Sequence, residues 1–464
     1  MRFIVTTMLA IGLLGLVVST AQADDYASSR DVQAAVDSYM ATGSDDTSLV
    51  GGTGSAGYDA GFWIRGGDFL LRINATIQAR YEAWDWDDED LAEDERFFEE
   101  WAGDTSGFSL PRATLKLSGE APCNICYYVE LEFGHFGRDA AEARDEEGPS
   151  SNPGRRRDDG LGPHQQSNNF DNTREAWIEW CYCPAFNFRM GQVQLASTRQ
   201  MMTAPELQQF VDISYASSAI GLTMPGYTDR NRDHGILIHG GFGCSNEWSY
   251  VLSATNGDGG DSIRNVIDHR TSDNLAFGGR VNWAFMAPIG YEEGALRQAT
   301  CQWYGELGAW GFYYADREDK GHASVGDATC YGVDLAMGWG GFSFTAAYNF
   351  CEVSGSDFFD DSDVSAWLVQ LGYHFPGTAW EIAARADGVT ANEGFDDGDM
   401  IEYAFGVNYY LNGHANKLQL DVSFLEASDD EGFFGLPGVY PGYQGGFGGE
   451  NSAVLIRFQW QLAL

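Results

Sequence analysis

Lysine is scarce in this chain of 464 residues: only Lys116, Lys320 and Lys417 occur, so arginine supplies almost all of the positive charge. Acidic residues number 68 against 27 basic residues, which gives a formal net charge of -41 at pH 7. Phosphate backbones would be repelled by a surface this acidic, so nucleic acid is excluded as a partner. The acidity fits either a solubilising surface or the attraction of cations to the mouth of a pore.

Long apolar runs are also missing. Beyond the N-terminus there is no stretch of about 18 consecutive apolar residues, which excludes membrane-spanning helices. Arg2, an apolar run at 3–18 and the small residues of Ala21-Gln22-Ala23 are typical of a cleavable signal peptide. We therefore expect a signal peptide at 1–23, with an uncleaved signal anchor as the alternative. An exported chain of this kind enters a membrane only through strands.

Catalytic motifs are absent. The chain contains no HExxH, GxSxG or phosphate-binding P-loop, and His135, His239 and His374 stand isolated in the sequence. We expect no enzymatic activity. A barrel-type outer-membrane enzyme that assembles its site from distant strands stays open as an alternative, as does a surface-structural or adhesive barrel with a plugged lumen.

Alternating polarity is the main positive signal, and it begins near Asp68. Between 69 and 84, apolar residues such as Ile73 and Ile77 alternate with polar residues such as Asn74 and Gln78. This period of two predicts strands with one apolar and one hydrophilic face. We predict sixteen strands, at 68–84, 108–120, 126–136, 172–181, 186–195, 233–242, 248–256, 275–286, 300–315, 328–338, 342–353, 364–375, 379–389, 400–411, 417–428 and 451–464.

Connections between these strands alternate between short and long. An even number of strands, with short turns on one side and long loops on the other, predicts an all-β protein. Its fold would be a closed antiparallel transmembrane β-barrel with short periplasmic turns and long external loops. The barrel domain would cover 62–464. Residues 24–61 are polar and rich in glycine, with a short helical candidate at 30–40, and we expect a periplasmic leader there.

Four segments carry a family resemblance: Asp68-Phe69-Leu70-Leu71-Arg72, the strand from Arg112 to Leu117, Thr173-Arg174-Glu175-Ala176-Trp177, and Arg189-Met190-Gly191-Gln192 before a long loop. In their order and spacing, the chain resembles the phosphate-selective porin O and P family over roughly 62–464.

The resemblance implies a homotrimeric porin in the outer-membrane lipid of a bacterial cell. Each barrel would form a water-filled channel for passive diffusion of small hydrophilic or ionic solutes, with anions such as phosphate as a candidate class. A third external loop, here 196–232, would fold inward as the constriction. The scarcity of lysine, the acidic external loops and the terminal Leu464 depart from the family pattern, so phosphate specificity stays open.

The family's inward positive residues carry over to named positions. They are Arg72, Arg80, Arg112, Lys116 and Arg189, with Arg199 at the start of the constriction loop.

Two acidic residues, Glu130 and Glu179, also fall on the polar face of their strands. The expected register places Lys116 opposite Glu130 and Glu179 near Arg189. Cross-strand ion pairing is therefore an alternative to a selectivity role for these charges.

Cysteine and acidic clusters give the last expectations. Cys330 and Cys351 lie on neighbouring predicted strands, almost equidistant from the tight turn at 339–341, so they are a candidate disulfide. The external loop 85–107 is crowded with carboxylates but lacks the spacing of an EF-hand. We expect at most loose divalent-cation binding by acidic loops and no other cofactor, and the identity of any metal is open.

Overall fold

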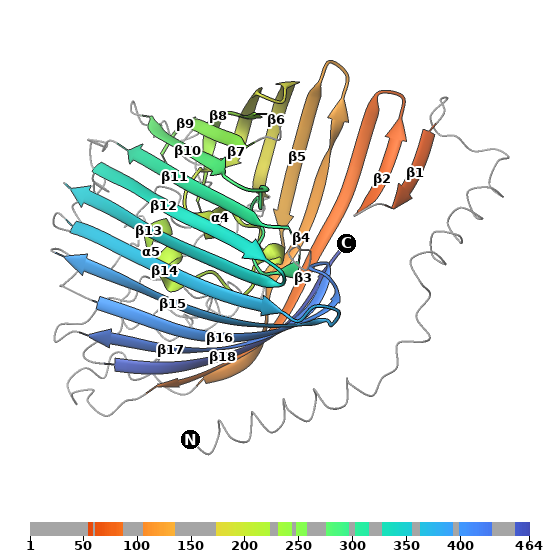
Figure 1. Ribbon diagram of the computed structural model, residues 1–464. Coiled ribbons are helices and arrows are strands. Elements are labelled where there is room, and N and C mark those ends of the chain that lie inside the picture. Colours follow the sequence, from red (N-terminus) through yellow and green to blue (C-terminus); the bar gives the residue numbers. More distant parts are fainter. Residues whose placement is uncertain are drawn as a thin grey trace, which may run out of the picture.

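Strands form almost all of the regular secondary structure in the computed structural model, which describes residues 54–58, 61–86, 105–134, 173–222, 231–243, 247–257, 275–296, 302–314, 327–354, 362–392, 399–428 and 451–464. Sixteen antiparallel strands close into a barrel, shown in Figure 1. They are β3 (Phe69–Trp86), β4 (Thr105–Ala121), β5 (Ile125–Glu132), β6 (Thr173–Cys183), β7 (Phe186–Gln194), β8 (Arg232–Phe242), β9 (Trp248–Thr255), β10 (Ala276–Ala284), β11 (Tyr304–Tyr314), β12 (Asp327–Trp339), β13 (Phe342–Ser354), β14 (Ser362–His374), β15 (Trp380–Asn392), β16 (Asp399–Asn412), β17 (Asn416–Ser428) and β18 (Asn451–Ala463). Each predicted strand overlaps one of these, so the predicted fold is confirmed.

The barrel closes between its first and last strands. Each strand from β3 to β17 pairs with the next in the sequence, and β18 pairs with β3 from Ala453 opposite Trp86 to Ala463 opposite Thr76. Closure gives every strand a hydrogen-bonding neighbour on both edges, which is the condition for burying a sheet in hydrocarbon.

A hairpin precedes the barrel. Strands β1 (Gly54–Tyr58) and β2 (Phe62–Gly66) pair with each other, and β2 continues the sheet along the first residues of β3. The leader predicted at 24–61 therefore needs a correction, because its last residues already belong to the sheet. β1 contains only small residues before Tyr58, so it shows no apolar alternation that reveals a strand. The signal peptide and the rest of the leader lie outside the described residues.

The two faces of the wall follow the alternation in the sequence. In β16 the side chains of Tyr403, Phe405 and Val407 are exposed on the outside, whereas Glu402 and Asn408 are buried on the inside. This arrangement places apolar side chains toward lipid and polar side chains toward the lumen.

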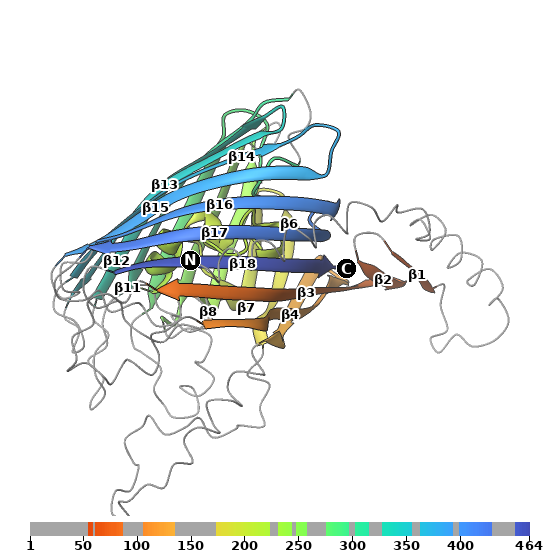
Figure 2. The same cartoon turned by 90° about the horizontal axis from the view of Figure 1, so that it is seen from below.

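The lumen is partly filled by the loop between β7 and β8. This constriction loop contains α4 (Arg199–Met202), the short 3₁₀ helix η2 (Pro205–Leu207) and α5 (Tyr215–Leu222), which lie inside the ring of strands in Figures 1 and 2. α5 packs against β14 and β15, where Ala219 and Ile220 join an apolar cluster with Val364 and Ala366. None of the helices in the described part of the chain is long and apolar enough to cross a membrane.

Candidate functional site

Asp212 fastens the constriction loop to the first two barrel strands. Its Oδ2 accepts a hydrogen bond from Nη1 of Arg80 at 3.0 Å, and its Oδ1 accepts one from Nη2 of Arg112 at 3.1 Å. The neighbouring Val211 accepts from Arg80 at 3.2 Å and donates its N–H to Asp421 of β17 at 2.9 Å. All four of these side-chain groups are buried, so solvent screens the ion pairs weakly.

Further bonds hold the loop against β15, β16 and β17. Lys417 donates from Nζ to the carbonyl oxygen of Gln208 at 2.6 Å. Gln209 donates from Nε2 to Oε1 of Glu381 at 2.7 Å, and its carbonyl oxygen accepts from Nδ2 of Asn408 at 2.8 Å. This side of the lumen is therefore occupied by protein at the height of the loop.

A cavity of about 260 Å³ lies on the other side of the loop, which we call the eyelet. Its wall comes from β4 to β8 and its inner boundary from the constriction loop. Seven charged side chains line it: Arg112, Lys116, Arg174 and Arg232 are cationic, and Glu130, Glu175 and Asp212 are anionic.

Ion pairs organise the charges of the eyelet. Arg174 lies 3.4 Å from Glu130, Arg232 lies 2.9 Å from Glu175, and Lys116 binds Glu206 of the constriction loop. The hydroxyl of Tyr128 also donates to Glu130 at 2.8 Å. Opposite charges in contact partly cancel each other's field, so the eyelet presents paired dipoles with a small cationic excess among the lining groups.

Glu206 belongs to the loop and not to the barrel wall. Burial raises the pKa of its carboxyl group, but the ammonium group of Lys116 lowers it more, and the pKa lies below the usual value of glutamate. Glu206 is therefore ionised at neutral pH and holds η2 to β4.

Three of the predicted site residues line the eyelet: Arg112, Lys116 and Glu130. The register places Lys116 directly opposite Glu130, as expected from the turn. The two side chains have other ion-pair partners, however: Lys116 binds Glu206 and Glu130 binds Arg174. The inserted loop and the neighbouring strand supply closer partners than the cross-strand neighbour.

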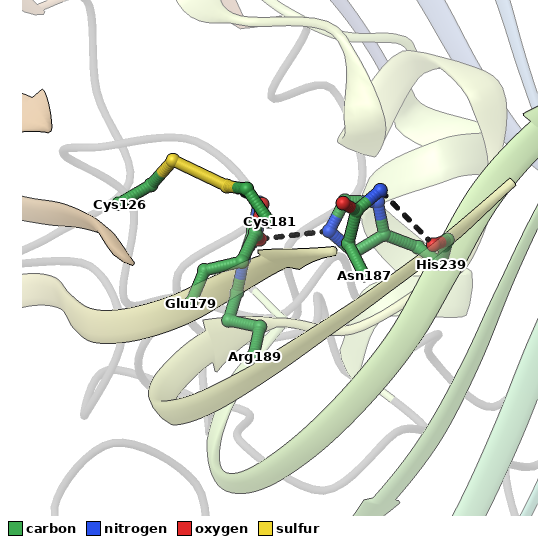
Figure 3. Close-up of a disulfide and its surroundings, with 6 residues drawn as sticks. All are labelled: Cys126, Glu179, Cys181, Asn187, Arg189 and His239. Atoms are coloured by element: carbon green, nitrogen blue, oxygen red, sulfur yellow. Dashed lines mark hydrogen bonds and ion pairs between the residues drawn. A yellow bond between two sulfur atoms is a disulfide. The ribbon is translucent and has the colours of Figure 1, made fainter. Parts of the chain in front are cut away.

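Glu179 and Arg189 lie beside the eyelet and do not line it. Nε of Arg189 donates to Oε2 of Glu179 at 2.7 Å, and Nε2 of His239 lies 2.7 Å from the same oxygen. Arg189 also stacks over the ring of Trp177, 3.7 Å from its centroid. Figure 3 shows the cluster next to a disulfide between Cys126 and Cys181.

The other predicted arginines also lie outside the eyelet. Arg80 and Arg199 are 1% and 2% exposed, and both hold the loop in place: Arg80 through Asp212, and Arg199 through Glu306 at 3.3 Å. Arg72 is exposed near the start of β3, opposite Ser118. Of these three candidates for the pore lining, Arg80 and Arg199 are covered by the contacts of the constriction loop, and Arg72 stays a candidate away from the eyelet.

Sequence reasoning missed Arg174 and Arg232 as lumen residues. The β5–β6 register shifts so that Glu130 pairs with Glu175 and Leu131 with Thr173, which leaves Arg174 as an extra residue. At such a bulge strict alternation fails, and both Arg174 and Glu175 reach the lumen. Arg232 is the first residue of β8, at the end of the predicted loop.

The described cysteines form two disulfides, Cys126–Cys181 and Cys330–Cys351. Cys330 and Cys351 are direct register partners on β12 and β13, with their Cα atoms 4.1 Å apart. Within the part of the chain that the structure describes, no group of three potential metal ligands is close enough to hold an ion. Most of the acidic loop 85–107 lies outside the described residues, so loose divalent-cation binding there stays a prediction.

Solved structures were compared with this architecture. The chain is similar in fold to an anion-selective porin from Comamonas acidovorans, with a TM-score of 0.55 and 12% identity over 85% of this chain and 100% of that one. It is also similar to the outer-membrane channel DcaP of Acinetobacter baumannii, with a TM-score of 0.49 and 8% identity over 88% of this chain and 100% of that one. No curated protein matches it significantly in sequence.

A family model matches residues 77–431, which is most of the chain. The family is one of channels and not of enzymes. The protein is an outer-membrane porin, which forms a water-filled path for passive diffusion of small hydrophilic or ionic solutes across the bacterial outer membrane. The chain belongs to the phosphate-selective porin O and P family.

Proposed function

We propose that the channel prefers small anions, modestly, over cations and that they pass through the eyelet. The observation that carries this proposal is the arc of cationic side chains on the eyelet wall. Arg112 and Lys116 on β4, Arg174 on β6 and Arg232 on β8 line the eyelet directly with three carboxylates, whereas the fourth carboxylate, Glu206 bound to Lys116, is not part of the lining. In a narrow space with low-dielectric walls, even a small excess charge biases ion traffic.

The pairing of these charges limits the preference. Each of the four cations has a carboxylate within ion-pair distance, so a passing anion meets partly neutralised groups. An anion that is bound too tightly would block its own path, and paired cations avoid this outcome. The solute class proposed is therefore small inorganic or organic anions in general, with phosphate as one member.

Planar-bilayer recording tests the preference. Purified protein in a potassium chloride gradient should show stepwise conductance. Its reversal potential should be shifted from zero toward the equilibrium potential of chloride. Arg232→Gln should shift the reversal potential toward the equilibrium potential of potassium, because it removes one positive charge from the lining. Arg72→Gln is the matched control, since Arg72 is exposed outside the eyelet. A wild-type reversal potential shifted toward the equilibrium potential of potassium would reject the anion preference.

We also propose that the protein assembles as a homotrimer, with the arc from β5 to β10 facing its neighbours. The strands of this arc have 8 to 11 residues, whereas those from β12 to β18 have 13 or 14. A lipid-facing strand needs about 9–11 residues to cross the hydrocarbon, so β5 and β9, with 8 each, are short for contact with lipid. Native mass spectrometry in detergent should find three copies, and a purely monomeric spectrum would reject the assembly.

The proposal includes passive transport without catalysis. The solutes cross down their own gradients and leave unchanged. Recovery of chemically altered solute from the far side of a vesicle membrane would favour the alternative of a barrel enzyme.

A further inference from the structure

The connection between β10 and β11 also enters the lumen, from the periplasmic side. The predicted strands 275–286 and 300–315 leave a connection at 287–299. In the structure, residues 287–296 turn inward, and Ile289, Glu293 and Ala295 are 3%, 5% and 0% exposed. We call residues 287–296 the periplasmic strut.

The strut is bonded directly to the constriction loop. The N–H of Glu293 donates to the carbonyl oxygen of Leu207 at 3.0 Å, and Oε2 of Glu293 accepts from the N–H of Gln209, also at 3.0 Å. The same oxygen accepts from Nε2 of Gln370 on β14 at 3.1 Å. Arg199, at the start of α4, donates to the carbonyl oxygen of Gly290. The two ends of the described loop segment from α4 to η2 are thus both held by the strut.

The strut is also fixed to the barrel wall. The N–H of Ala295 donates to Oε1 of Glu381 on β15 at 2.9 Å. The hydroxyl oxygen of Tyr291 accepts from Nε of Arg280 on β10 at 3.0 Å. Gly294 has a φ of +83°, and an added Cβ there would lie 3.1 Å from Glu381, so glycine permits this close approach. With anchors on β10 and β15, the strut spans one side of the lumen.

The position of the eyelet is consistent with this division of the lumen. Its lining residues come from β4 to β8 and from the constriction loop, and none belongs to β10–β18 or to the strut. Two inserted segments, one from each side of the membrane, meet at Leu207, Gln209 and Glu293. Together they occupy the side of the lumen opposite the eyelet.

We propose that the periplasmic strut sets the solute size limit of the channel, with Glu293 as the positioning residue that holds the constriction loop. This inference rests on the channel function and adds the element that fixes its width. Removing the carboxylate leaves the N–H of Gln209 and the amide of Gln370 without this buried acceptor, which weakens the loop position. The constriction loop can then move toward the strut, and this movement widens the eyelet.

Single-channel recording and liposome swelling with sugars of increasing size test the role of Glu293. Glu293→Ala should raise the conductance about twofold and admit larger sugars, because the conductance of a narrow pore is set by its constriction. Glu292→Ala is the matched control on the same strut, since its carboxylate faces His414 of the wall at 3.7 Å. Unchanged conductance and size limit in Glu293→Ala would overturn the inference.

A cross-link tests the same contact without loosening it. Leu207→Cys combined with Glu293→Cys places two thiols where the backbones already touch. The oxidised pair should conduct like the wild type, and reduction should raise the conductance toward that of Glu293→Ala. Closure of the channel on oxidation would show that the loop must leave the strut during conduction, against the proposal. A wild-type protein without any conductance would instead reject the channel itself.

Discussion

At the scale of single residues, Asp212 ties the constriction loop to two strands of the barrel. Its carboxylate is shared between the guanidinium groups of Arg80 and Arg112, and all three side chains are buried. Removing one partner of a buried ion pair leaves charges without compensation, which is far more costly than losing an exposed pair.

We predict that Asp212→Ala lowers the free energy of unfolding by about 3–5 kcal/mol. The variant should also increase current noise in single-channel records, because the loop loses its tie to β3 and β4. Denaturant unfolding in detergent measures the first effect. Asp363→Ala, which removes an exposed carboxylate of β14, is the control. Equal destabilisation by the two variants would contradict the role of Asp212.

The ion pair between Glu206 and Lys116 gives the loop a dependence on pH. The folded protein depresses the pKa of Glu206, so the pair contributes stability above the unfolded pKa of about 4.3, and this contribution is lost as the pH falls through the lower folded value. The loop should therefore stay anchored to β4 at pH 5 and loosen only in acid below the unfolded pKa of glutamate, because the folded pKa is lower still. Current noise recorded against pH measures this, and Glu206→Gln should abolish that acid transition.

Individual pore residues were only partly predictable from the sequence. Alternation placed Arg112, Lys116 and Glu130 on the inner face, where they line the eyelet, and Lys116 and Glu130 lie where β4 and β5 pair without a register shift. It had no means to show that Arg80 and Arg199 would be covered, since that depends on where the loop lies. The prediction missed Arg174 because a bulge interrupts the period of two at that residue.

At the scale of elements, the two disulfides tie neighbouring strands at different places. The bond between Cys330 and Cys351 links β12 to β13 near their external ends, and the bond between Cys126 and Cys181 links β5 to β6 near their periplasmic ends. Export to an oxidising compartment favours both bonds.

We predict that non-reducing peptide mapping recovers both cross-links from protein purified without reductant. Alkylation before digestion should label Cys123, which has a free and exposed thiol, and leave Cys330 and Cys351 unlabelled. Recovery of Cys330 and Cys351 as alkylated peptides would contradict the predicted pairing.

The constriction loop and the periplasmic strut differ in how visible they are in the sequence. The loop is long, lies between two clear strands and stands third among the external loops, so the family resemblance locates it. The strut is marked by no comparable signal. Its inward path follows from hydrogen bonds between Glu293 and a loop some 85 residues earlier in the chain, a relation that local periodicity does not encode.

At the scale of the whole molecule, the apolar outer belt explains why the strand count was predictable. The lipid imposes alternation on every strand it touches, so a regular pattern repeats sixteen times. The β1–β2 hairpin escaped this prediction because it extends the sheet beyond the closing seam with β18 and begins with small residues.

The membrane belt yields a prediction for substitutions on the outside. Phe405 lies near the middle of β16 and is 59% exposed, whereas Phe69 begins β3 and is 58% exposed. We predict that Phe405→Arg lowers the free energy of unfolding in lipid by about 2–4 kcal/mol and Phe69→Arg by about 1 kcal/mol or less. Reversible unfolding in lipid vesicles measures both. Equal losses of unfolding free energy at the two positions would contradict a membrane belt centred on the middle of the strands.

The seam between β3 and β18 has a consequence for how the barrel is assembled. Arg80 of β3 donates both to Gln459 of β18 and to Asp212 of the constriction loop. The pairing of β3 with β18 and the docking of the loop therefore depend on the same side chain, although Gln459 and Asp212 lie far apart in the chain. Such long-range pairing is slow to form. We therefore expect closure of the seam and docking of the loop to be coupled steps late in the assembly of the barrel.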